Sequence, residues 1–308
     1  MKALITGSEG FVGRYLRREL EENGHTVLRA DIVDLPGVER VDLLDAEAVE
    51  ALLARTAPDW IFHLAGQADI GLSWHKPRFT FELNILAALH VLEALRKAGR
   101  KETRVVIVGS SDQYGHLGAD GARVTEETPM RPSSPYAISK RAQEELAALY
   151  ARAYGLSVCM TRSFNHGGAG QRTGFMIPDF ASGIVRVERG LSPTLSVGNL
   201  AARRDFTHVR DIVRAYRLLA EKGRPGEVYN VGSGTTWSAQ EVLDRLLALA
   251  KMPVPVRQDP ARMRPSDSPV ICCDHTKLSR DTGWEPVLPL DQILTDTLDY
   301  FRSLPELP

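Results

Sequence analysis

The sequence is poor in the features that mark secreted, membrane-spanning or metal-binding proteins. It has only three cysteines, Cys159, Cys272 and Cys273, in 308 residues. An odd count with two adjacent members gives no disulfide framework, and no Cys/His spacing resembles a zinc site. No run of about 18 apolar residues could span a bilayer, and the first residues enter a strand-like segment without a signal peptide. We therefore expect a cytoplasmic protein with no membrane partner and no metal.

An excess of one charge is also missing. The 38 basic and 39 acidic residues give a formal net charge of -1, and neither half of the chain is obviously basic. A nucleic-acid partner is therefore not expected, although local arginines can still bind a small anion. The length, with 43% hydrophobic residues, suffices for one large α/β domain or one and a half.

The first half of the chain alternates short apolar runs with longer amphipathic ones. This pattern predicts strands buried on both faces and joined by helices, hence a doubly wound parallel sheet. The expected strands are Ala3–Thr6, Thr26–Ala30, Trp60–His63, Val105–Val108 and Leu156–Thr161. The expected helices are Val12–Glu22, Ala46–Ala54, Phe81–Lys97 and Tyr136–Tyr154.

The second half is less regular and predicts a smaller cap. It contains an expected loop at Gly167–Thr173, helices at Gly174–Arg189 and Val209–Lys222, and a strand at Glu227–Val231. We expect a dinucleotide-binding domain over residues 1–165 and a mainly substrate-binding lobe over residues 166–308. Elements around residues 205–235 are expected to return to the first domain.

Three glycines follow the first strand and open the first helix. Gly7, Gly10 and Gly13 lie in TGSEGFVG, where glycine permits a tight turn and close approach of backbone N–H groups to a pyrophosphate. The helix N-terminus adds partial positive charge there. Asp31 ends the second strand, where a carboxylate reads ribose hydroxyls and repels a 2′-phosphate. This favours NAD(H), with NADP(H) as the alternative because Arg29 is nearby.

A second constellation predicts proton transfer. Tyr136 and Lys140 lie four residues apart at the start of a helix, on one face. A free phenol has a pKa of about 10, and we expect the neighbouring ammonium to lower it. Ser110 ends the fifth strand, at the edge where ligands of parallel sheets bind. Its hydroxyl can donate to the same substrate oxygen. His63, at the end of another strand, is expected to pack without taking part in the chemistry.

The motifs together resemble the extended short-chain dehydrogenases/reductases that act on nucleotide sugars. The matching pieces run in family order from TGSEGFVG and Asp31 through HLAGQA, Asn84, GSSDQYG and SPYAISK to RSFN. The resemblance implies a Rossmann-type sheet, a smaller C-terminal α/β substrate lobe, catalytic Ser110, Tyr136 and Lys140, and a homodimer through Asn84–Lys97 and Tyr136–Tyr154. The cofactor contacts that we expect are Gly7, Gly10, Phe11, Val12, Asp31, Asp42, Leu43, Leu64, Ala65, Gly66, Gln67, Asn84, Tyr136 and Lys140.

Within that family, the second half is similar to GDP-mannose 4,6-dehydratases and to GDP-4-keto-6-deoxymannose reductases. The similar segments are RSFNHGGAGQRTGFMIPDFA, VGNLAARRDFTHVRD and MRPSDSP. By this resemblance the chain takes a GDP-linked sugar, its arginines meet the diphosphate and an aspartate meets the ribose. The substrate contacts implied are Ser111, Asn165, Asn199, Leu200, Arg204, Arg264 and Asp267.

Asp112 bears on the choice between the two reactions. A dehydratase needs an extra acid/base, and the related dehydratases carry a glutamate where this chain has the shorter Asp112. The compact chain favours the reductase, which reduces a C4 ketone to a GDP-6-deoxyhexose such as GDP-D-rhamnose. A dehydratase, or another nucleotide-sugar epimerase or dehydratase, stays open. A cofactor-sensing protein without chemistry is a third alternative, which the intact Ser110, Tyr136 and Lys140 argue against.

Overall fold

A computed structural model describes residues 1–115, 123–260 and 270–308. In this part of the chain a seven-stranded sheet has the order β11-β7-β5-β4-β1-β2-β3, and every neighbouring pair is parallel. Its carboxyl ends therefore share one edge, which confirms the predicted doubly wound α/β fold. The strands are β1 (Lys2–Thr6), β2 (Thr26–Asp31), β3 (Val38–Arg40), β4 (Trp60–His63), β5 (Arg104–Ser110), β7 (Val158–Ser163) and β11 (Val228–Val231).

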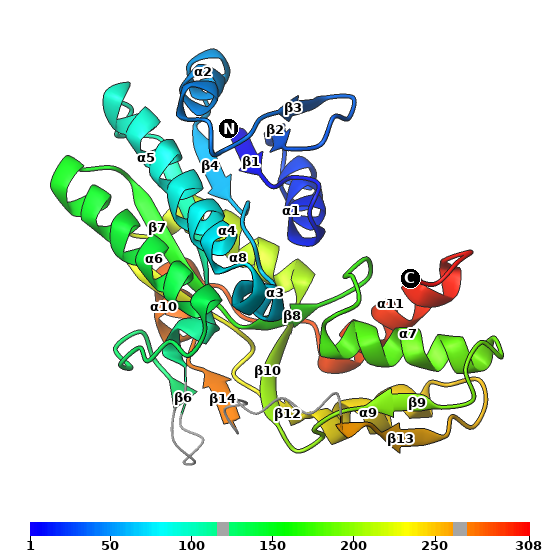
Figure 1. Cartoon of the computed structure of the whole chain (residues 1–308). Coiled ribbons are helices and arrows are strands. Elements are labelled where there is room, and N and C mark those ends of the chain that lie inside the picture. The colour runs from blue at the N-terminus through cyan, green and yellow to red at the C-terminus, as the bar shows by residue number, and fades with distance from the viewer. Residues whose placement is uncertain (116–122, 261–269) are drawn as a thin grey trace.

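Helices cover both faces of this sheet. One core cluster joins it to α1 (Phe11–Glu22), α8 (Val209–Lys222) and α10 (Thr276–Thr282), and another joins it to α2 (Ala46–Thr56), α5 (Ala87–Lys97) and α6 (Pro135–Tyr154). Figure 1 shows α5 and α6 side by side along one face of the sheet. Strand β4 is buried at all four positions, as a strand covered on both faces requires.

The starts of two of these helices follow from capping side chains. Asp45 accepts from the backbone N–H of Ala48 at 3.0 Å, and Ser134 accepts from that of Ala137 at 3.1 Å. Each bond satisfies a donor that the first turn of a helix leaves unpaired. The second cap fixes where α6 begins, and therefore where Tyr136 lies.

A second, smaller sheet forms in the C-terminal half. Strand β10 (Arg203–His208) pairs with β8 (Asn165–Gly167), β12 (Thr236–Ser238) and β14 (Val270–Cys273), and β14 pairs with β6 (Arg123–Val124). Strands β9 (Leu195–Val197) and β13 (Val256–Gln258) form a separate pair. Helices α7 (Met176–Glu188), α9 (Ala239–Ala248) and α11 (Leu290–Ser303) share a core cluster with these strands. Because α8 packs on α1 and β11 pairs with β7, the chain crosses back to the large sheet. The boundary expected at residue 165 stays a prediction.

The stretch expected as one helix over Phe81–Lys97 is divided. After α3 (Ile70–His75) and α4 (Pro77–Phe81), a π-helical turn covers Glu82–Leu86 before α5 begins. Such turns are often found at functional sites, and this one carries the buried Asn84. A short 3-10 turn, Ser111–Tyr114, follows β5.

Membrane spans, metal clusters and disulfides are all missing from the described part of the chain. None of its helices is long and apolar enough to cross a membrane. Within the same residues, no group of three or more His, Cys, Asp and Glu side chains is placed to hold a metal ion. All three cysteines are buried as free thiols.

Candidate functional site

The glycine-rich turn after β1 is shaped by close backbone contacts. Gly7 has φ +71°, and a Cβ atom there would lie 2.9 Å from the backbone of Ala65, in the loop after β4. A Cβ on Gly13 would lie 2.4 Å from the carbonyl oxygen of Gly7. The first glycine therefore permits the turn and the third permits the close packing of α1 beneath it. This cradle fits the pyrophosphate of a dinucleotide, which the N-terminus of α1 would face.

The end of β2 carries the carboxylate expected to read the ribose. Asp31 accepts from the backbone N–H of Glu9 at 2.9 Å and from that of Ile32 at 2.8 Å, so its position is fixed. Arg29 donates to the carboxylate of Glu9 at 3.3 Å and to the carbonyl oxygen of Pro36 at 2.7 Å. The positive charge of Arg29 is therefore already paired within the protein.

The remaining adenosine-side residues have partners within the protein. Leu43 packs in the hydrophobic core, and the carboxylate of Asp42 accepts from the backbone N–H of Leu44 at 2.9 Å. Phe11 and Val12 are half-buried at the start of α1. The ring of Phe11 is parallel to that of His166, with centroids 6.4 Å apart.

Asn84 links the loop after β4 to α6, the helix that carries Tyr136 and Lys140. Its side chain accepts from the backbone N–H of Gln67 at 2.7 Å, donates to the carbonyl of Gln67 at 3.1 Å, and donates to the Ser139 hydroxyl at 2.9 Å. A Cβ on Gly66 would lie 2.8 Å from Asn84 Oδ1 and 3.5 Å from Lys140 Nζ. Gly66 therefore lies close to the ammonium of Lys140. A direct contact of Asn84 with a cofactor stays a prediction.

Lys140 is buried beneath the carboxyl edge of the sheet. Its ammonium donates to the carbonyl oxygen of Val108 at 2.9 Å and to Gln143 Oε1 at 3.0 Å. Burial lowers the pKa of Lys140 to about 8, since the charged form loses hydration. His63, fully buried nearby, contacts the Thr6 hydroxyl at 2.9 Å. Its pKa falls to about 3 through burial and the charge of Lys140, so it is neutral at physiological pH.

The expectation that the ammonium lowers the phenol pKa is wrong for this arrangement. Burial raises the pKa of Tyr136 above its usual value, and the negative charge of Asp112 raises it further. Hydrogen bonding to Ser110 lowers it only in part. The physical reason is that the phenolate would be formed in a nearly water-free position, while Lys140 is engaged by two carbonyl acceptors. Tyr136 is therefore held in its proton-carrying form.

Ser110 and Asp112 form a compact turn beside the phenol. The Ser110 hydroxyl donates to Asp112 Oδ2 at 3.1 Å and accepts from the Asp112 backbone N–H at 3.2 Å. Burial raises the pKa of Asp112, while the hydrogen bond from Ser110 and the charge of Arg204 oppose that shift. Arg204, from β10, thus brings positive charge from the C-terminal half to the catalytic edge.

The other residues expected to bind substrate differ in burial, and two of them lie outside the described part of the chain. Ser111 is buried directly after Ser110, and Asn165 is exposed on β8. Asn199 accepts from the backbone N–H of Ala201 at 3.0 Å, and Leu200 packs against the C-terminal core. Arg264 and Asp267 lie outside the described residues. No bound ligand tests these assignments, which stay predictions.

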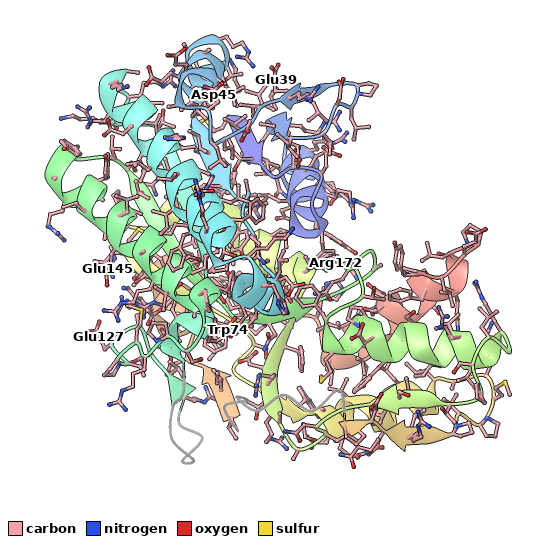
Figure 2. The ribbon with its side chains drawn as sticks, viewed as in Figure 1. Glu39, Asp45, Trp74, Glu127, Glu145 and Arg172 are labelled. Carbon is pink, nitrogen blue, oxygen red and sulfur yellow. The ribbon has the colours of Figure 1, made fainter. Side chains whose placement is uncertain are left out.

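Two exposed residues flank the junction of the large sheet with the C-terminal half. Trp74, on α3, is 61% exposed, so its indole is not a packed core group. Arg172, labelled in Figure 2, lies on the loop after β8. It forms an ion pair with Asp69 at 3.1 Å. This pair ties that loop to the N-terminal cap of α3.

Sequence reasoning missed a buried polar network behind Ser110. Gln113 accepts from the Ser110 backbone N–H at 3.0 Å and donates to Glu144 at 2.7 Å, while Arg162 pairs with Glu144. The Ser-x-x-Gln spacing of residues 110–113 is a capping-box pattern that could have revealed the first contact. Nothing in the sequence indicates the other two.

Known proteins resemble the chain along nearly its whole length. Residues 4–297 match the family described as GDP-mannose 4,6 dehydratase. The GDP-6-deoxy-D-mannose reductase of Pseudomonas aeruginosa is 34% identical over 303 residues, which cover 98% of this chain and 97% of that protein.

Solved structures agree with the sequence match. The structure of RMD from Pseudomonas aeruginosa complexed with NADPH superposes with a TM-score of 0.89, at 32% identity over 98% of this chain and 99% of that one. A UDP-glucose 4-epimerase of Thermus thermophilus in complex with NAD gives a TM-score of 0.88, at 30% identity and the same coverage. The chain therefore belongs to the GDP-mannose 4,6-dehydratase family, within the extended short-chain dehydrogenases/reductases that modify nucleotide sugars with NAD(P).

Proposed function

We propose that this enzyme reduces the C4 ketone of GDP-4-keto-6-deoxy-D-mannose to a GDP-6-deoxyhexose, with GDP-D-rhamnose as the expected product. The observation that carries the proposal is the state of Asp112. Its carboxylate is bound to the Ser110 hydroxyl at 3.1 Å, and its pKa is raised by burial. Reduction of the ketone needs only a proton donor, which Tyr136 provides. A dehydratase also needs an acid/base group that is free to take the C5 proton and help the C6 hydroxyl to leave.

The chain's own residues supply the proton and hold the ketone. Bound NADH or NADPH supplies the hydride for C4. Tyr136, kept in its proton-carrying form, donates the phenolic proton to the C4 oxygen as negative charge develops there. The hydroxyl of Ser110 rotates from Asp112 to donate to the same oxygen. Lys140, fixed by Val108 and Gln143, would hold the cofactor ribose and supply positive charge to the site.

The cofactor proposed is NAD(H) in preference to NADP(H). Asp31 is held in place by two backbone N–H groups, those of Glu9 and Ile32. Arg29 is paired with that glutamate, so a 2′-phosphate would meet more negative than positive charge. The NADPH complex of the Pseudomonas relative keeps NADP(H) as the second candidate, which a comparison of kcat/KM for NADH and NADPH would decide.

The substrate proposed is a GDP-linked sugar, held by the arginines of the C-terminal half. Arg204 supports this proposal because its charge reaches Asp112, beside the catalytic Ser110. Asn165, Asn199, Leu200, Arg264 and Asp267 are proposed as further contacts on the resemblance stated above. An arginine fork matches phosphate oxygens bidentately.

A homodimer through α5 and α6 is proposed on the same resemblance. Exposed apolar side chains on and beside these helices support it, namely Phe79, Leu86, Ile138, Leu149 and Tyr154. Burying such groups between two copies would remove apolar surface from water. Light scattering of the purified protein tests the stoichiometry, and a monomer at micromolar concentration would reject it.

The reaction itself is tested by supplying the keto sugar with NADH. We expect one NADH oxidised per sugar reduced, with the product identified by NMR spectroscopy. Conversion of GDP-mannose to a keto sugar without added reductant would reject the reductase and establish the dehydratase instead. The similarity of the chain to the dehydratase family over residues 4–297 makes that the second candidate.

A further inference from the structure

A buried ion pair, Arg162 with Glu144, lies next to the turn that follows Ser110. Arg162, on β7, donates from Nε to Glu144 Oε2 at 2.9 Å and from Nη2 to Oε1 at 2.7 Å. Both side chains are less than a tenth exposed. The remaining guanidinium nitrogen donates to the Tyr114 hydroxyl and to the carbonyl of Glu126, both at 2.9 Å. A two-point pair with its other donors satisfied holds its members in one geometry.

The ion pair is attached to the catalytic helix. Glu144 follows Lys140 by four residues and Tyr136 by eight, so the three side chains lie along one face of α6. A contact that fixes Glu144 therefore also helps to fix the helix that carries the phenol. Arg162 fixes that helix against β7, which is paired directly with β5.

Gln113 connects this assembly to Ser110. Its amide nitrogen donates to Glu144 Oε2 at 2.7 Å, while its Oε1 accepts from the Ser110 backbone N–H at 3.0 Å. A Cβ on Gly109 would lie 2.6 Å from Gln113 Oε1 and 2.3 Å from the Thr161 carbonyl. Only a glycine at residue 109 leaves room for the side-chain amide of Gln113 to bind the Ser110 backbone N–H. Gln113 is fully buried, so both bonds are shielded from water.

We propose that Gln113 is a positioning residue that sets the Ser110 hydroxyl relative to the Tyr136 phenol. It does so by tying the Ser110 backbone to Glu144 on the helix that carries the phenol. Gln113 meets neither substrate nor cofactor in this proposal and acts only through Ser110. The proposal rests on the proposed function for its kinetic test. Errors of about 1 Å in such a pair cost on the order of a hundredfold in rate.

The kinetic test is a double-mutant cycle of Gln113→Met with Ser110→Ala. In the native background we expect Gln113→Met to lower kcat by on the order of tenfold to a hundredfold, with KM for the keto sugar and NADH changed by less than about twofold. In the Ser110→Ala background we expect less than about a twofold further loss. An equal loss in both backgrounds would show a general structural effect and overturn the proposal. Tyr229→Phe, which removes two part-buried hydrogen bonds elsewhere in the fold, controls for lost stability.

Hydrogen exchange of backbone amides tests the role of Gln113 without any substrate. In Gln113→Met we expect faster hydrogen exchange at the Ser110 amide, with Val106 and Val108 unchanged. Unchanged protection at Ser110 would overturn the positioning role whatever the enzyme reduces. Absence of turnover by the unmodified enzyme with keto sugars would reject the proposed function, while the exchange result would still decide the role of Gln113.

Discussion

Replacing Lys140 by methionine should change how stability depends on pH. Lys140 is 6% exposed, and burial lowers its pKa from 10.5 to about 8. Between these two values the unfolded chain binds more protons at this residue than the folded chain does. The free energy of unfolding of the native protein should therefore rise with pH across this window. Methionine removes the titration while keeping a long, unbranched side chain.

The magnitude follows from the two pKa values. The shift costs the folded protein about 3.3 kcal/mol at pH 7 and about 0.8 kcal/mol at pH 10. The substitution also leaves the carbonyl of Val108 and the Oε1 of Gln143 without their donor, at a cost of about 1–3 kcal/mol that is independent of pH. Between pH 7 and pH 10, the free energy of unfolding of the native protein should therefore rise by about 2.5 kcal/mol relative to that of the variant.

Urea unfolding followed by circular dichroism at pH 7, 8, 9 and 10 measures this difference directly. Lys251→Met, which replaces an exposed lysine, controls for the loss of one positive charge. A Lys140→Met difference that stays constant over the four pH values would refute the reasoning, because it would mean that Lys140 ionises alike in the folded and unfolded chains.

Three further changes have defined outcomes. Tyr136→Phe should lower kcat by about 10²–10⁴-fold while the dissociation constant for NADH, measured by fluorescence, stays within about twofold; weak NADH binding in this variant would indicate a structural role for the ring. Asp31→Asn should raise kcat/KM for NADPH relative to NADH, because it removes a charge that repels a 2′-phosphate, and an unchanged ratio would place that phosphate elsewhere. Glu144→Gln should cost about 3–5 kcal/mol in urea unfolding because Arg162 is left buried without its charge partner, and a loss below about 1 kcal/mol would contradict the buried pair described above.

The elements of the fold were predictable where burial is uniform. The strand predicted at Trp60–His63 and the helix predicted at Val209–Lys222 have the same bounds in the structure. The four residues of β4 are all buried, and α8 has a well-defined apolar face, so periodicity alone determines both. The π-helical turn around Asn84 was not predictable, because no residue pattern distinguishes it from a continuous helix.

Within the candidate site, the sequence indicated that Ser110 lies beside Tyr136 but not how the phenol ionises. Tyr136, Lys140 and Ser110 come from motifs whose spacing implies a shared edge. The direction of the Tyr136 pKa depends on burial and on Asp112, which no spacing reveals. Gln113, Glu144 and Arg162 lie 31 and 18 residues apart in the chain, so only the folded sheet and helix bring them together.

The π-helical turn at Glu82–Leu86 determines which side chains of the turn itself and of the following α5 are buried. A π turn holds one more residue than an α turn, so it offsets every later side chain around the helix axis. In this arrangement Asn84 faces Gln67 and Ser139, while Val91, Leu92 and Leu95 pack in the core. Deleting one residue there would keep the helix continuous but leave only one of these two sets correctly oriented. The chain length of this segment is therefore constrained as strictly as its composition, and alignments that place a gap here would misassign the buried face of α5.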